Sequence, residues 1–319
     1  MFAAVTLLMT AVSAQEHTPS QTTGELVIFH AGSLSVPFRD VSKLFSEMYP
    51  NVTVKAEAAG SRDTARKVSD LGRRCDVLGS ADFKVIDNLL IPDHAEFNIR
   101  FATNEMAIAY TDRSKYSETV STDNWPGLLL ADDVVFGRAD PNRDPCGYRT
   151  VMVFQLAEKY YEIPGLAKRL EEKHGQRYIR PKETDLLGLL EAGELDFLFI
   201  YRSVAMQHSL RFLTLPDEIN LKSAKFTELY ATATIKVTGK KPGTYMRRSG
   251  APMVYGVTIP KNCESRKLAE AWVRLLLSRA GQAVMERNGQ PPIAPAPTAQ
   301  FDKLPASLKP LCAAISETE

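Results

Sequence analysis

GELVIFHAGSLSVPF, residues 24–38, is the stretch that decides the fold. Its first half holds the short apolar run Leu26–Phe29, which ends in the turn-forming residues His30–Ser33. Apolar side chains then recur at helical spacing as far as Met48, and Pro50 ends the helix. The stretch therefore predicts a strand, a glycine-containing loop and a helix, in that order.

The same order repeats along the chain. Val52–Val54 predicts a second strand, and Gly60-Ser61 leads into its helix. A third strand is predicted around Val77, and a second series follows. That series has a strand at residues 134–137, a helix at about 147–161 and a strand at 197–201. Strands that alternate with helices predict an α/β fold with mostly parallel sheets.

Two long runs, residues 101–110 and 252–260, flank the second series, and each reads as one extended strand. A chain of 319 residues exceeds one compact core, so two domains are expected. We predict a discontinuous first lobe, residues 24–105 plus 256–319, and an inserted second lobe, residues 106–255. A helix at 265–279 and a proline-rich segment complete the first lobe. The two crossing strands, near Met106 and Val254, would act as a hinge.

The N-terminal residues predict export. Residues 1–14 form an apolar run that ends in Val12-Ser13-Ala14, small residues of the kind signal peptidase cuts. We assign residues 1–23 to a signal peptide with a polar linker, and a disordered or buried N-terminus is the alternative. The mature protein would then be periplasmic or otherwise extracytoplasmic. Four cysteines allow three disulfide pairings, between which the sequence does not choose.

The charge of the chain excludes one large class of partner. Its 39 basic and 38 acidic residues give a net charge of +1, without the clustered basic surface that nucleic-acid binding requires. The hydrophobic share of 44% is that of an ordinary globular protein. We therefore expect no nucleic-acid partner.

Three loops enter predicted helices with Gly and Ser or Cys at the entry. They are Gly32-Ser33, Gly60-Ser61 and Asp144–Arg149. Free backbone N–H groups and the positive end of the helix dipole make such a position an anion site. Each serine could equally be a simple N-cap. Two such loops in one lobe and one in the other suggest an interlobe cleft lined with neutral donors for an anion.

Four motifs together resemble a known family. They are FHAGSL (29–34), EAAGS (57–61), DPCGYR (144–149) and GELDFLFIY (193–201). Their order is similar to that of the periplasmic molybdate/tungstate-binding proteins of ABC transporters, in the tungstate-transport branch. The resemblance implies a two-lobed type II binding-protein fold of the cluster-C/D kind. Each lobe would be a mostly parallel sheet flanked by helices, and two hinge strands would join the lobes.

The resemblance also implies a ligand and partners. The ligand would be tungstate or molybdate, without a cofactor, delivered by a monomer to a membrane permease and its ATPase. Gly32, Ser33 and Ser61 would meet the oxyanion from the first lobe. From the second lobe it would meet the loop residues Asp144, Pro145 and Cys146, and the hydroxyl of Tyr201.

Asp144 and Glu183 would contact the metal centre of the bound oxyanion directly, because carboxylates are hard oxygen ligands. Sulfate and phosphate could not accept such ligands. Alternatively, Asp144 is an N-cap, Glu183 is a first-turn helix acid and Tyr201 is an interfacial residue without a ligand contact.

Rival functions stay open at this point. A binding protein for sulfate or phosphate would keep the fold and change the ligand. Ferric binding would need paired tyrosines, and Tyr201 has no obvious neighbour of that kind. A hydrolase would use Cys146 with a carboxylate and His30. No nucleophile elbow, Walker loop, dinucleotide fingerprint or HExxH motif occurs, so we expect no enzyme and no catalytic residue.

Overall fold

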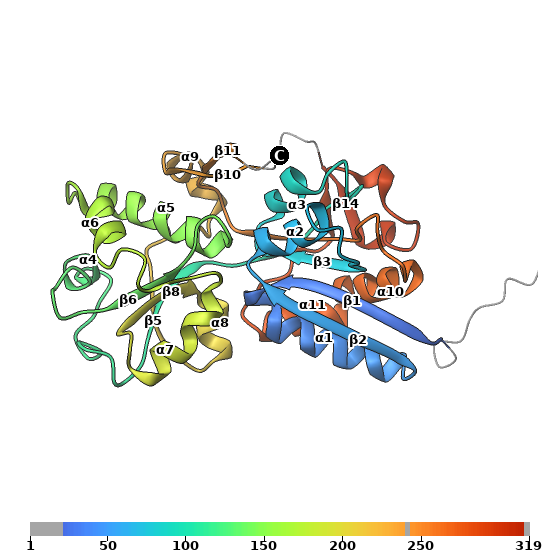
Figure 1. The fold of residues 1–319 in the computed structure, drawn as a ribbon, viewed down its shortest axis with the longest axis horizontal. Helices are drawn as coiled ribbons and strands as arrows, with labels where there is room; N and C mark the ends of the chain where they lie inside the picture. Colours follow the sequence, from blue (N-terminus) through green and yellow to red (C-terminus); the bar gives the residue numbers. More distant parts are fainter. Residues whose placement is uncertain (1–21, 240–242, 316–319) are drawn as a thin grey trace, which may run out of the picture.

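The computed structural model describes residues 22–239 and 243–315. The predicted signal segment, apart from residues 22 and 23, lies outside the described residues. Two five-stranded sheets form two lobes that lie side by side (Figure 1). We call them the first and the second lobe, each defined by its sheet.

The first sheet has the strand order β2-β1-β3-β12-β4. β1 runs parallel to β2 and β3, and β12 runs antiparallel to both of its neighbours. The bounds are β1 Gly24–Ala31, β2 Val52–Ala59, β3 Val77–Ser80, β4 Ile99–Thr103 and β12 Val254–Thr258.

Helices cover both faces of the first sheet (Figure 1). α1 buries Phe38, Val41 and Phe45, which lie three and four residues apart and so share one helix face. Phe38 meets Trp272 of α10 edge-on, with ring centroids 4.8 Å apart. The bounds are α1 Ser35–Met48, α2 Ser61–Ser69, α3 Phe83–Leu89, α10 Arg266–Leu277 and α11 Arg279–Arg287, with the small strands β13 Ala296–Thr298 and β14 Cys312–Ala314.

The second sheet repeats this plan in the order β7-β6-β8-β5-β9, with only β5 reversed. Its strands are β5 Met106–Tyr110, β6 Phe136–Ala139, β7 Ile179–Arg180, β8 Phe197–Tyr201 and β9 Arg211–Thr214. Its helices are α4 Trp125–Leu128, α5 Pro145–Tyr160, α6 Leu166–Glu172, α7 Leu187–Ala192, α8 Arg202–Gln207 and α9 Thr227–Ala231. A hairpin of β10 Thr234–Thr238 and β11 Tyr245–Ser249 follows. The predicted α/β class with two mostly parallel sheets is confirmed.

The prediction that residues 101–110 form one strand is wrong. The run breaks at Asn104-Glu105, and its halves, β4 and β5, lie in different sheets. The Asn104 side chain accepts a hydrogen bond from the Glu105 N–H at 2.9 Å, and the Glu105 carbonyl accepts one from Arg202. These side-chain and loop partners replace the ladder bonds that a continuous strand would need.

The second crossing lies before β12, which begins at Val254 within the first sheet. Val254 and Tyr255, assigned above to the second lobe, therefore pair with the first sheet. The helix predicted at 265–279 ends at Leu277, and a second helix, α11, follows it at once.

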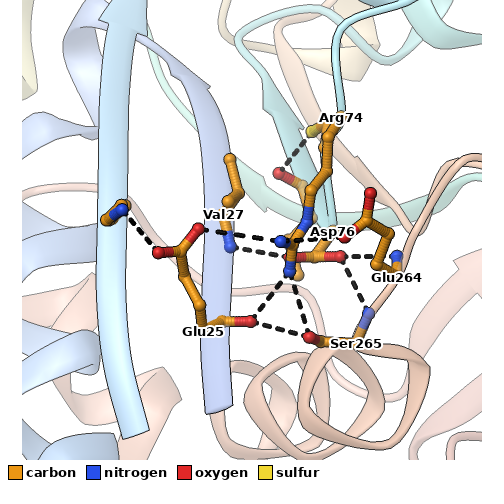
Figure 2. A network of polar contacts seen from close by, with 9 residues as sticks. Glu25, Val27, Arg74, Asp76, Glu264 and Ser265 are labelled. Atoms are coloured by element: carbon orange, nitrogen blue, oxygen red, sulfur yellow. Dashed lines mark hydrogen bonds and ion pairs between the residues drawn. The ribbon is translucent and has the colours of Figure 1, made fainter.

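A buried carboxylate ties β1, β3 and the start of α10 together (Figure 2). Asp76 is fully buried and accepts hydrogen bonds from the backbone N–H groups of Val27, Glu264 and Ser265, at 2.8, 2.9 and 3.0 Å. Arg74 pairs with the same carboxylate at 3.1 Å. Asp76 thus fixes where the C-terminal helices dock on the first sheet.

Two general findings complete the fold. Within the described residues, no helix is long and apolar enough to cross a membrane. All four cysteines lie within the described residues and are free.

Asp76→Asn should lower the free energy of unfolding by about 3 kcal/mol, because it leaves Arg74 and three N–H donors without their shared anion. Urea unfolding followed by circular dichroism measures this. Glu264→Gln is the matched control, because Glu264 also pairs with Arg74 but its own side chain is 65% exposed. The control should cost well under about 1 kcal/mol, and an equal loss in both variants would contradict the assignment.

The loss should also depend on pH. Burial alone would raise the pKa of Asp76, but the hydrogen bonds from Val27, Ser265 and Glu264 outweigh burial and lower it. A lowered carboxyl pKa stabilises the fold above the unfolded-state value of about 3.9, and the contribution disappears as the pH falls through the folded-state value. The stability difference between wild type and Asp76→Asn should therefore be full at pH 7 and shrink below about pH 4.

Candidate functional site

The site lies where the loop after β1 meets the segment before α7. Gly32 begins a short 3-10 turn (Gly32–Leu34), and Glu183 begins another (Glu183–Leu186). A Cβ on Gly32 would lie 2.9 Å from the Thr184 hydroxyl and 3.3 Å from each carboxylate oxygen of Glu183. Gly32 therefore brings the backbone of the first lobe into direct contact with this carboxylate of the second lobe.

A second glycine allows an even closer approach of the lobes. A Cβ on Gly60, at the start of α2, would lie 2.4 Å from the Arg143 carbonyl oxygen. The residues that follow, Arg62 and Asp63, bond directly to the second lobe. Arg62 donates its N–H to that carbonyl at 3.1 Å, and Asp63 pairs with the Arg143 guanidinium at 2.6 Å. The structure is therefore that of the closed form.

Two carboxyl groups are buried together in this junction. Asp144 and Glu183 are each 1% exposed, and the Glu183 N–H donates to Asp144 Oδ2 at 3.3 Å. Neither carboxylate oxygen of Glu183 has a hydrogen-bond partner. Burial, followed by the negative charge of Asp144, raises the pKa of Glu183 well above its usual range. Burial also raises the pKa of Asp144. Arg149 acts electrostatically on Asp144 and Lys182 on Glu183, but these effects do not outweigh burial, so ionisation of both carboxyl groups is unfavourable.

Asp144 also caps α5. Its Oδ1 accepts the N–H of Cys146 at 2.9 Å, and Pro145 occupies the first turn of the helix, where its missing N–H costs nothing. The N-cap interpretation of Asp144 thus holds, together with its contact to Glu183. The Cys146 N–H, predicted to meet the ligand, is engaged by Asp144 in this form.

Ser33, Ser61 and Tyr201 are also buried, and each forms a hydrogen bond to a residue other than Asp144 and Glu183. Ser61 Oγ accepts the N–H of Ala81 at 2.9 Å. Ser33 Oγ accepts a hydrogen bond from Tyr255 at 3.1 Å. Tyr201 receives one from Arg149 at 2.9 Å. All eight predicted residues are buried: Gly32, Ser33, Ser61, Asp144, Pro145, Cys146, Glu183 and Tyr201.

The sequence reasoning missed Arg149 as a member of the site. Its guanidinium is 4% exposed, donates to the Ala81 carbonyl at 2.7 Å and crosses from α5 to the first lobe. The signal was available, because Arg149 lies one helical turn after Cys146 and so shares its face of α5. The expectation of neutral donors alone is therefore incomplete.

Tyr255 was also missed, and it corrects the argument about paired tyrosines. Its ring packs edge-on against Tyr201, with centroids 6.3 Å apart, so Tyr201 does have a tyrosine neighbour. Burial raises the pKa of Tyr255 to about 12 and that of Tyr201 well above its usual value. Both phenols are kept protonated, which is unfavourable for binding ferric iron as phenolates.

The cysteine and histidine of the hydrolase alternative are not activated. Burial, followed by the charges of Glu183 and Asp144, raises the pKa of the Cys146 thiol well above its usual value. A nucleophilic thiolate needs the opposite shift. His30 contacts the carbonyl of Ala31 at 2.8 Å, and burial lowers its pKa to about 4. Among the described residues, no group of three or more His, Cys, Asp or Glu side chains could hold a metal ion.

Two α/β lobes in contact over a buried polar junction are the architecture of a two-lobed solute-binding protein. The family model described as bacterial extracellular solute-binding protein matches residues 26–290, and the chain belongs to this family. The molybdate/tungstate-binding protein WtpA of Pyrococcus abyssi is 40% identical to it, over 97% of this chain and 96% of the relative. The family resemblance drawn from the four motifs is confirmed.

Other relatives agree in fold and class. An uncharacterized solute-binding protein of Petrotoga mobilis is 52% identical, over 90% of this chain and 89% of the relative. Among solved structures, the periplasmic molybdate-binding protein of Azotobacter vinelandii superposes with a TM-score of 0.58 at 14% identity. That match covers 83% of this chain and 98% of the other, and it shows a shared fold.

Gly60→Ala should keep the lobes apart, because the added methyl group would lie 2.4 Å from the Arg143 carbonyl oxygen. The backbone of Gly60, with φ −58° and ψ 140°, suits alanine, so the first lobe itself should fold normally. Small-angle X-ray scattering should give the variant a larger radius of gyration under the conditions where wild type is most compact. Gly188→Ala, where a Cβ meets nothing within 4 Å, is the control and should stay compact. A compact Gly60→Ala protein would refute this role of Gly60.

Proposed function

We propose that the protein captures tungstate or molybdate between its lobes and delivers the ion to an ABC importer. The observation that carries this proposal is the buried pair Asp144 and Glu183, with both Glu183 oxygens unpartnered. A buried carboxyl pair of which one member, Glu183, has no hydrogen-bond donor needs an electropositive partner of matching size.

The chemistry of the pair selects among oxyanions. Two carboxylates repel the oxygens of any tetrahedral dianion, so they must approach its central atom. A large, high-valent metal centre accepts additional hard oxygen ligands, whereas the sulfur of sulfate and the phosphorus of phosphate do not. The pair would thus favour tungstate and molybdate and reject sulfate and phosphate. The Pyrococcus relative is a molybdate/tungstate-binding protein, which supports this choice.

Hydrogen-bond donors would hold the oxygens of the ion. The 3-10 turn at Gly32-Ser33 and the start of α2 at Ser61 present backbone N–H groups that have no partner inside their helices. The Ser33 and Ser61 hydroxyls, the Tyr201 phenol and the Pro145-Cys146 turn complete the proposed ligand contacts. The Arg149 guanidinium, which donates to Tyr201, would offset part of the ion's charge.

Transport would follow from closure. We propose that residues 24–105 plus 254–319 and residues 106–253 move as two lobes about the crossing segments, with all of β12 in the first lobe. The closed monomer, exported by its N-terminal segment, would dock on a membrane permease driven by its ATPase. It would need no cofactor and catalyse no reaction. The protonated Cys146 thiol and the neutral His30 support this view over a hydrolase.

Glu183→Gln and Asp144→Asn should each weaken tungstate and molybdate binding by at least about tenfold, because each removes one charged metal ligand. Sulfate binding should stay weak or become tighter, because repulsion is removed. Isothermal titration calorimetry with tungstate, molybdate, sulfate and phosphate measures both effects.

Asp185→Asn is the matched control, since Asp185 lies in the same turn but is exposed and pairs with Lys182 at 3.4 Å. It should bind like wild type. Unchanged tungstate binding in Glu183→Gln and Asp144→Asn would remove the metal-contact assignment. Tight sulfate or phosphate binding by wild type would move the function to those anions.

Tungstate affinity should rise with pH. Burial and the charge of Asp144 raise the pKa of Glu183 in the closed arrangement, which favours its protonated form, whereas metal contact requires the carboxylate. Below this raised pKa, affinity should fall by up to about tenfold per pH unit. Calorimetry between pH 6 and 8, in buffers of different ionisation enthalpy, should detect proton release that Glu183→Gln abolishes. Affinity that rises as the pH falls would instead mean that a protonated carboxyl donates to an oxyanion oxygen.

A further inference from the structure

An interlobe cavity, about 300 Å³ in volume, is lined in part by Arg149 but not by the carboxyl pair. Three parts of the chain contribute polar side chains to it. They are Asp82 with the helix α3 that follows it, the first two turns of α5 and the strand β11. The polar side chains are Asp82, Lys84, Asn88, Tyr148, Arg149, Arg247, Arg248 and Ser249.

The lining of this cavity is strongly positive. Four cationic side chains face one carboxylate, that of Asp82. Asp82 already accepts a hydrogen bond from Tyr148 and lies 4.0 Å from Arg149. Asp87 acts electrostatically on Arg248 but is not part of the lining, and it accepts a hydrogen bond from Asn98 at 2.9 Å. At least two cations are left without an anion.

Arg248 gives the second, independent observation. Its side chain is 6% exposed, and its Nε has no hydrogen-bond partner. Its one recorded hydrogen bond, from Nη2 to the Lys84 carbonyl, is long at 3.4 Å. Asp82 and Asp87 act on Arg248 electrostatically, and its guanidinium lies 6.0 Å from the centre of the Tyr148 ring, but its buried Nε is left without an acceptor. An unsatisfied buried guanidinium N–H is unfavourable, so Arg248 is placed to bind an anion that would accept from it.

Closure of the lobes assembles this cavity. Lys84 belongs to the first lobe, Arg149 to the second, and Arg247 and Arg248 to the hairpin that follows the second lobe. Bringing these cations together costs electrostatic energy, which an anion between them would offset. A ligand that binds only the assembled cavity must favour the closed form.

We propose that this cavity binds a second, divalent tetrahedral oxyanion, such as sulfate or phosphate, and that its binding holds the lobes closed. Its volume corresponds to about ten waters, which leaves room for an oxyanion that keeps part of its hydration. The cavity has no unpaired carboxylate, so it would not discriminate against sulfate as the inner site does. If the cavity holds the lobes closed, sulfate bound there should slow the release of tungstate. This effect rests on the proposed function, whereas the anion site itself does not.

Equilibrium dialysis of the tungstate-loaded protein against labelled sulfate at low ionic strength tests the site. One sulfate per protein is expected. Arg247→Gln and Arg248→Gln should each weaken its binding by about tenfold, as for the loss of one charge-assisted contact. Arg247 is exposed, so its variant should fold even if Arg248→Gln does not. Lys236→Gln is the matched control. Lys236 lies opposite Arg247 on the neighbouring strand of the same hairpin but does not line the cavity.

The consequence for closure is measured as the dissociation rate of labelled tungstate, with immobilised ligand-free protein as the acceptor. At constant ionic strength, sulfate should slow release severalfold in wild type and in Lys236→Gln, but not in Arg247→Gln. The proposal is overturned if loaded wild type retains no sulfate, if Lys236→Gln loses it equally, or if bound sulfate leaves the release rate unchanged.

If the proposed function is wrong, the protein retains no tungstate in the loading step, which distinguishes this failure from the absence of an anion site. Sulfate is then counted on the unloaded protein, and a difference between Arg247→Gln and Lys236→Gln still decides whether the cavity is an anion site.

Discussion

Asp144 and Glu183 are buried side by side where the first lobe covers them, and this arrangement constrains the rest of the molecule. Burial raises the pKa of both carboxyl groups, and the negative charge of Asp144 raises that of Glu183 further. The closed form therefore needs compensation from elsewhere. Part of it comes from contacts between the lobes, such as the hydrogen bond from Arg149 to the Ala81 carbonyl. The remainder would come from the ion that the junction encloses.

Close backbone approach and a polar hinge network make that enclosure possible. Arg62, fully buried, reaches from α2 to the carbonyl of Asn142 at 3.0 Å and also to that of Thr238. At the crossing, Asn104 donates to the Tyr255 hydroxyl, which in turn donates to Ser33 Oγ. The segment that joins the sheets is thus linked by two hydrogen bonds to the loop proposed to hold the ion. A change in hinge conformation would displace that loop directly.

The alternation of strands and helices, and the loops at Gly32 and Ser61, could be predicted from sequence because both depend on local patterns. The break at Asn104 had a sequence signal that the prediction missed, because the polar residues Thr103–Glu105 interrupt the run. Tyr255 joins the site from an apolar run far along the chain, and only the fold brings it to Ser33. Arg149 could have been placed by helical spacing from Cys146. The unpartnered state of Glu183 is a property of the tertiary structure alone.

Tungsten L3-edge X-ray absorption of the tungstate-loaded protein tests the central claim most directly. If the carboxylates of Asp144 and Glu183 contact the metal, the spectrum should report more than four oxygen neighbours. The additional distances should be longer than those of free tungstate and should disappear in the double variant Asp144→Asn, Glu183→Gln. A spectrum of four equal oxygens, identical to that of free tungstate, would contradict the claim. The junction would then hold the ion by hydrogen bonds to its oxygens alone.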